Sequence, residues 1–174
     1  MDKRIQIWNV FHDGEINARV RMSRLELKFP PDLLALTVAG GMWMVSTLTP
    51  SLDVPLTYRL PVAAVLFSAT VALVTTARVA FARAGTTFNP TSPSRSSHLV
   101  TASVYRVTRN PMYLGMLLAL IAAAVLFSNL FSLLLSAAFV AYMNRFQIAP
   151  EERVLNARFG PAYESYARSV RRWI

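Results

Sequence analysis

The 174-residue chain has no cysteine, only two histidines and few acidic residues, and each shortage excludes a class of protein. Without cysteine there is no disulfide framework and no thiolate metal site. The two histidines, His12 and His98, lie far apart in the sequence, so we expect no metal centre. Nine acidic residues stand against eighteen basic ones, which gives the chain a net charge of +9.

The excess of basic residues does not indicate nucleic-acid binding. Arginines lie at the ends of apolar segments, as they do beside membrane-spanning helices, and no recognisable nucleic-acid module surrounds them. Hydrophobic residues make up 54% of the chain and are clustered, which indicates a membrane protein with lipid partners. The first 30 residues carry charges throughout, so we expect no cleavable signal peptide.

Four apolar runs predict an all-α integral membrane bundle with four transmembrane helices. A helix needs about 20 residues to cross the hydrocarbon core. No charged residue occurs from Met112 to Asn144, and a single helix of that length would reach about 50 Å, too long for one crossing. The polar pair Ser128-Asn129 therefore predicts a tight turn between two helices. The four spans are predicted near residues 31–50, 60–82, 111–127 and 130–148.

Basic residues are distributed unevenly, and their placement predicts the topology. Residues 1–30 carry six of them, the segment 78–109 carries five and no acid, and the tail after Met143 carries six. The loop between the first two spans carries only Arg59. We therefore expect a multi-pass protein of the inner (plasma) membrane with both termini and the functional site on the cytoplasmic side.

The regions outside the spans differ in composition. The middle loop is rich in Thr, Ser, Pro and Gly and is non-helical by composition. After the fourth span, Pro150 can occupy the first turn of a new helix, and Gly160 can end that helix. The N-terminal extension fits either an interfacial amphipathic helix or a disordered tail. The predicted parts are an extension at 1–24 and a membrane domain at 25–174, which includes a loop at 84–110 and a cytoplasmic C-terminal helical cap at 150–174.

Charged side chains stand at both ends of the predicted helical hairpin. Arg109 precedes the third span, and Glu151-Glu152 follow the fourth. Because both ends reach the same membrane face, they must lie close together. A guanidinium group binds carboxylates and acids bind ammonium groups, so we expect a pocket for a zwitterion. Taken singly, four residues fit interfacial anchors, namely Tyr105, Tyr113, Tyr163 and Tyr166.

Short motifs follow one another in a fixed order in the second half of the chain. They are His98-Leu99-Val100-Thr101, Tyr105-Arg106, Arg109 to Gly115, Glu151-Glu152, and Phe159-Gly160 to Tyr166. In this order they resemble the isoprenylcysteine carboxyl methyltransferase family and its phospholipid N-methyltransferase relatives. The resemblance covers roughly residues 25–174. Ser103-Val104 stand where relatives usually have Gly-Pro, and Asn110 replaces the histidine of eukaryotic members.

The resemblance implies an integral membrane enzyme that uses S-adenosylmethionine and needs no metal. It implies catalytic roles for Arg109 and Glu152, with Arg109 orienting the acceptor or the carboxylate of the cofactor. It also implies that the cofactor is bound by His98, Leu99, Tyr105, Tyr113, Glu151 and Glu152.

The nominal reaction of the family is carboxyl O-methylation of a lipophilic, isoprenylcysteine-like substrate. Nothing in the sequence fixes the acceptor, so phospholipid N-methyltransferase and small-thiol S-methyltransferase activities are alternatives. An NADPH-dependent membrane reductase with a similar C-terminal arrangement is a further alternative. The last alternative is a non-catalytic membrane protein on the same scaffold.

Overall fold

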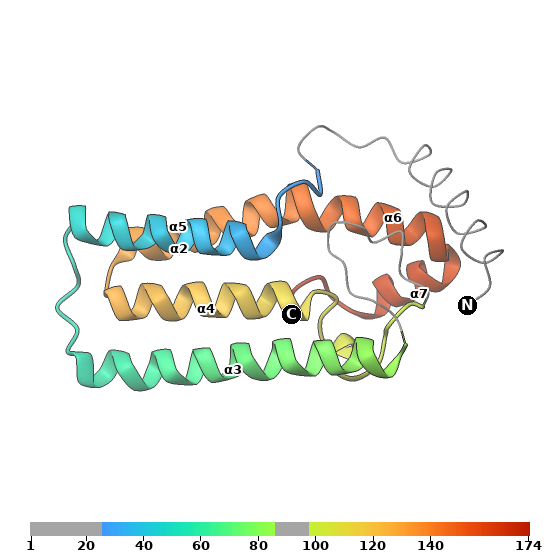
Figure 1. Ribbon diagram of the computed structural model, residues 1–174, viewed down its shortest axis with the longest axis horizontal. Helices are drawn as coiled ribbons and strands as arrows, with labels where there is room; N and C mark the ends of the chain where they lie inside the picture. The colour runs from blue at the N-terminus through green and yellow to red at the C-terminus, as the bar shows by residue number, and fades with distance from the viewer. Residues whose placement is uncertain (1–25, 86–97) are drawn as a thin grey trace.

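The computed structural model describes residues 26–85 and 98–174 as long helices that lie side by side (Figure 1). Within these ranges there is no β-strand, and the one isolated bridge joins Thr108 to Arg171. The prediction of an all-α fold is therefore confirmed. The predicted extension at 1–24 and residues 86–97 of the predicted loop lie outside the described residues.

Among the described residues, two helices are long and apolar enough to cross a membrane, α2 (Pro31–Leu48) and α3 (Leu56–Arg83). Proline opens α2 and immediately precedes α3, where its fixed φ and missing N–H suit a helix start. Apolar side chains on both helices point outward, and Leu36 and Val65 are 70% and 69% exposed. Such a surface is too apolar for water and suits lipid contact.

A hairpin of two shorter apolar helices packs against them, α4 (Pro111–Phe127) and α5 (Leu130–Tyr142). The turn lies at the predicted Ser128-Asn129, where Ser128 is left-handed and Asn129 caps α5 by accepting a hydrogen bond from the Ser132 N–H. The turn also contacts the loop between α2 and α3. There, the Ser128 hydroxyl donates a hydrogen bond to the Leu52 carbonyl at 2.7 Å.

Helices α3 and α4 make the most extensive helix–helix contact of the described chain. Gly115 permits it, since a Cβ atom there would lie 2.9 Å from Val74 Cγ2. The Thr70 hydroxyl donates to the Gly115 carbonyl at 3.0 Å across the same contact. The close approach holds the last turns of α3 beside the start of α4.

The chain continues from α5 into a π-helical segment, η3 (Met143–Ile148), and then into α6 (Ala149–Phe159) without an intervening loop. Pro150 does lie in the first turn of α6, as predicted. Proline cannot donate to the carbonyl four residues earlier. The Leu27 N–H takes its place, donating to the Phe146 carbonyl at 3.1 Å. The Phe146 carbonyl thus has a donor although Pro150 cannot supply one.

The C-terminal helices fold back toward the bundle (Figure 1). Gly160, with φ +50°, ends α6, as the sequence predicts, and Pro161 opens α7 (Pro161–Ser169). The last residues then reach the start of α4, where the Arg109 N–H donates to the Arg171 carbonyl at 3.0 Å. A short 3₁₀ helix, η2 (Ser103–Arg106), precedes this contact.

Candidate functional site

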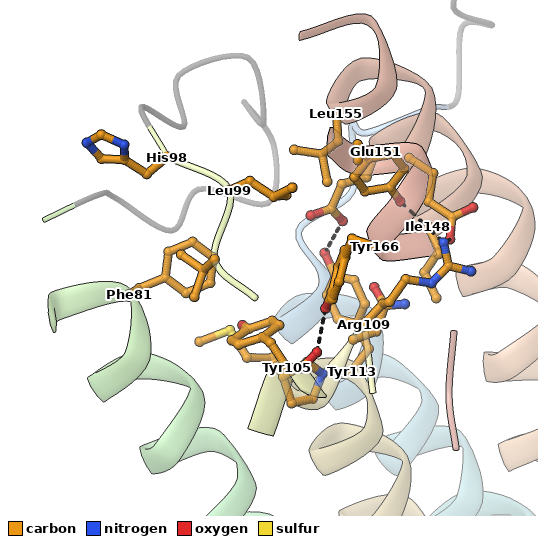
Figure 2. A pocket seen from close by; sticks show the side chains of 16 residues that line it. Phe81, His98, Leu99, Tyr105, Arg109, Tyr113, Ile148, Glu151, Leu155 and Tyr166 are labelled. Carbon is orange, nitrogen blue, oxygen red and sulfur yellow. Dashed lines mark hydrogen bonds and ion pairs between the residues drawn. The ribbon is translucent and has the colours of Figure 1, made fainter. Parts of the chain in front are cut away.

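A hollow opens at the end of the bundle where the start of α4, the π segment, α6 and α7 converge (Figure 2). It holds about 750 Å³ of space not filled by atoms, its mouth included. The lining residues are Phe81, His98, Leu99, Val100, Tyr105, Arg109, Asn110, Pro111, Met112, Tyr113, Ile148, Glu151, Glu152, Leu155, Tyr163 and Tyr166.

Glu152 is held by two arginines. Arg109 Nη1 lies 3.2 Å from Glu152 Oε1, and Arg172 binds the same carboxylate through Nη2 at 2.6 Å and Nε at 3.1 Å. This partly buried pairing raises the pKa of Arg172, chiefly through its hydrogen bonds to Glu152. Glu152 therefore links the base of α4 to the end of the chain.

Glu151 has a different environment from its neighbour. The Tyr113 hydroxyl donates to Glu151 Oε2 at 3.0 Å, and Gln147 Nε2 donates to the Tyr113 oxygen at 3.3 Å. No basic side chain in residues 26–85 and 98–174 forms an ion pair with it. Burial raises the pKa of Glu151 to about 7. The hydrogen bond from Tyr113 lowers this pKa, and the negative charge of Glu152 raises it further. Glu151 is thus a partly buried acid that has no cationic partner among the described residues.

Aromatic side chains form one wall of the hollow. The Tyr166 hydroxyl donates to the Tyr105 carbonyl at 2.7 Å, and the rings of Phe81 and Tyr105 meet edge-to-face with centroids 5.5 Å apart. Burial raises the pKa of Tyr163 to about 12 and that of Tyr105 further still. Both hydroxyls therefore stay protonated at neutral pH and act as neutral polar groups. Their rings offer π faces that attract cations.

The hollow contains an acid that has no cationic partner among the described residues, and it also contains a guanidinium group. Arg109 Nη1 approaches the Tyr163 oxygen at 3.5 Å, while its buried Nε has no hydrogen-bond partner among the described residues. A ligand with an ammonium group and a carboxylate matches this pair, since each charge would meet its opposite. The aromatic wall suits a flat ring or a second positive charge.

The structure brings together most of the residues that the sequence singled out. Arg109 and Glu152 are in direct contact, and Leu99, Tyr105, Tyr113 and Glu151 line the same hollow. His98 is different, because its exposed imidazole lies at the edge and points away from the centre (Figure 2). His98 still belongs to the lining of the hollow, and its role in cofactor binding stays a prediction.

Sequence reasoning missed several contributors to the site. Tyr163 and Tyr166 were interpreted as interfacial anchors, but α7 folds back and turns both into the hollow. Gln147 carried no motif signal, and Arg172 carried only that of the chain ending at 170–174, which resembles bacterial members of the family. Their partners Tyr113 and Glu152 lie 34 and 20 residues away, so neither contact was predicted. Ser103 is left-handed, with φ +59°, a conformation that glycine adopts without strain. The site thus keeps this backbone turn with a serine.

Comparison with known proteins places these observations in a family. Residues 58–162, more than half of the chain, match the sequence model of a family described as phospholipid methyltransferase. The chain belongs to the phospholipid methyltransferase family. This family is one of membrane methyltransferases, which agrees with the two apolar helices and with the resemblance seen in the motifs. Tyr163, Tyr166 and Arg172 lie beyond the matched residues.

A protein of Haemophilus influenzae described as uncharacterized is similar to part of the chain. The two are 41% identical over 63 residues, which is 36% of this chain and 100% of that protein. No solved structure matches this phospholipid methyltransferase family member.

Proposed function

We propose that the protein transfers a methyl group from S-adenosylmethionine to a lipophilic acceptor at the membrane surface. The observation that carries the proposal is that Arg109 and Glu151, an acid with no cationic partner among the described residues, line one hollow of a member of a methyltransferase family. When bound, S-adenosylmethionine supplies an electrophilic methyl group on a positively charged sulfur.

The residues of the hollow fit the charged parts of this donor. Glu151 would bind its ammonium group, which would replace the missing cation and return the pKa of Glu151 toward its ordinary value. Arg109 would bind its carboxylate. The rings of Tyr105 and Tyr166 border the remaining space and suit a sulfonium and an adenine ring.

Glu152 acts in this proposal as a positioning residue. Its carboxylate is already shared by Arg109 and Arg172, so it has little capacity for a further cation. Holding both guanidinium groups fixes the direction of Arg109 and ties the chain end across the hollow. A donor held in one orientation reacts faster, because a methyl transfer requires the attacking atom in line at about 3–3.5 Å.

We further propose four membrane crossings, with both termini and the hollow on the cytoplasmic side of the inner membrane. Helices α2 and α3 are long enough to cross, while α4 has 17 residues and would span only with its flanks. The continuous path from α5 through η3 extends the fourth crossing beyond the 13 residues of α5. The basic segments 1–30, 78–109 and 144–174 would then all face the cytoplasm.

The acceptor would enter sideways from lipid. The family description favours a phospholipid headgroup, and carboxyl O-methylation of an isoprenylcysteine-like molecule is the competing reaction. Both acceptors place a reactive atom at the membrane surface and an apolar tail in the hydrocarbon.

The proposal is tested by incubating the purified protein with methyl-labelled S-adenosylmethionine and a membrane extract, then identifying labelled products by mass. Phosphatidylethanolamine and an N-acetyl farnesylcysteine serve as defined acceptors. We expect Arg109→Ala and Glu152→Gln to lower transfer at least about tenfold, since each breaks the charged pair. The exposed Arg78→Ala and Glu164→Gln serve as controls. Absence of any labelled lipid, or equal rates in all variants, would refute methyl transfer at this site.

A further inference from the structure

A second hollow adjoins the first along the last turns of α3. It holds about 1140 Å³, its wide mouth included. Its lining comes from α3 and from the segment between Leu99 and Ser103, so Leu99 and Val100 border both hollows. The residues concerned are Thr75, Thr76, Val79, Ala80, Arg83, Ala84, Leu99, Val100, Thr101, Ala102 and Ser103.

The chemistry of this lining is that of an anion site with an apolar flank. Arg83 is its one charged residue among those described, and no acid occurs between Arg78 and Arg109 in the sequence. The Thr76 hydroxyl already donates to the Ala72 carbonyl at 2.6 Å. The hydroxyls of Thr75, Thr101 and Ser103 are the other polar side-chain groups of the lining, and each can donate to an anion.

The position of Arg83 along α3 matches the depth of lipid phosphates. The uncharged stretch that follows Arg59 runs for 18 residues, from Leu60 to Ala77, and ends at Arg78, close to the length that crosses the hydrocarbon core. With Arg78 at the hydrocarbon boundary, Arg83 lies about 7.5 Å beyond it along the helix, at the outer part of the headgroup layer. Exposed apolar residues such as Phe67 and Val71 cover the outside of α3 below it. Acyl chains lying there would bring a phosphate to Arg83.

We propose that this second hollow binds the phosphate of a glycerophospholipid through Arg83, with hydroxyls of Thr101 and Ser103 as further donors. The inference rests on the proposed function and makes this site the element that selects a phospholipid as acceptor. The part of the headgroup beyond the phosphate would pass Leu99 and Val100 to reach the first hollow. The carbonyl end of α3 repels anions, so binding depends on the side chain of Arg83 rather than on the helix.

The proposal is tested by lipid binding, which requires no methyl transfer. The full-length protein in detergent is titrated with a fluorescent short-chain phosphatidylethanolamine, and the probe is displaced by dihexanoyl phosphatidylglycerol or by dihexanoyl glycerol, which lacks the phosphate. We expect the phospholipid to displace the probe at an about tenfold lower concentration than the diacylglycerol. Arg83→Gln should remove this preference, and Arg83→Lys should keep part of it.

Arg78→Gln is the matched control, because Arg78 is exposed on the same helix but does not line the second hollow. Equal displacement by the two lipids in the wild-type protein would overturn the inference. So would an equal loss in Arg78→Gln and Arg83→Gln, which would indicate general charge attraction. A protein that prefers the phospholipid but transfers no methyl group would refute the proposed function alone.

Discussion

Glu151→Gln is the substitution for which the structure gives the clearest magnitude. Burial raises the pKa of the Glu151 carboxyl from 4.5 to about 7, so the ionised form is disfavoured in the folded protein. One pKa unit corresponds to about 1.4 kcal/mol, so full ionisation costs the fold at most about 3 kcal/mol. Glutamine removes the ionisation and can still accept a hydrogen bond from Tyr113.

The sign of the effect follows from proton binding. Between pH 4.5 and about 7 the folded protein holds a proton on Glu151 that the unfolded chain has already released, so stability falls as the pH rises. Glutamine does not ionise, so the variant does not lose stability in this way as the pH rises. We therefore expect Glu151→Gln to match the wild-type protein at about pH 4 and to exceed it by up to about 3 kcal/mol at about pH 8.

Thermal unfolding of the ligand-free protein in detergent, followed by circular dichroism at several pH values, measures this difference. Glu164→Gln is the matched control, since Glu164 lies exposed on α7 and should show no such trend. A Glu151→Gln protein that is less stable than the wild-type protein at about pH 8 would refute the reasoning. It would mean that the carboxylate is stabilised by a partner rather than destabilised by burial.

Two further substitutions test the packing and the edge of the site. Gly115→Val should destabilise the fold by about 1–3 kcal/mol through a clash with Val74. Gly41→Ala should not destabilise it, because the new Cβ atom would lie 3.9 Å from Leu135. Denaturant unfolding measures the stability of both variants. His98→Ala should leave methyl transfer within about twofold of the wild-type rate, because the imidazole points away from the centre of the hollow. A tenfold loss of methyl transfer in the labelled assay would contradict that placement.

Local sequence signals predicted the parts of the fold that depend on neighbouring residues. The Ser128-Asn129 turn, the start of α6 around Pro150 and its end at Gly160 follow from backbone preferences of these residue types. The contact of Arg109 with Glu152 followed from hydrophobic run lengths, because two spans of a hairpin must end at the same face.

Features that depend on distant residues could not be read from the sequence. The Leu27 N–H satisfies the Phe146 carbonyl that Pro150 cannot, a contact made across 119 residues. The distinction between Glu151 and Glu152 was equally hidden, because only the fold shows that the arginines reach one carboxylate and not the other.

The central claim is that Glu151 and Arg109 together hold the amino-acid part of S-adenosylmethionine, and isothermal titration calorimetry with S-adenosylhomocysteine tests it most directly. We predict that the wild-type protein binds this molecule and not NADPH, and that Glu151→Gln weakens binding by about tenfold or more at about pH 8. Binding of NADPH alone, or equal affinity for S-adenosylhomocysteine in the wild-type and Glu151→Gln proteins, would contradict the claim.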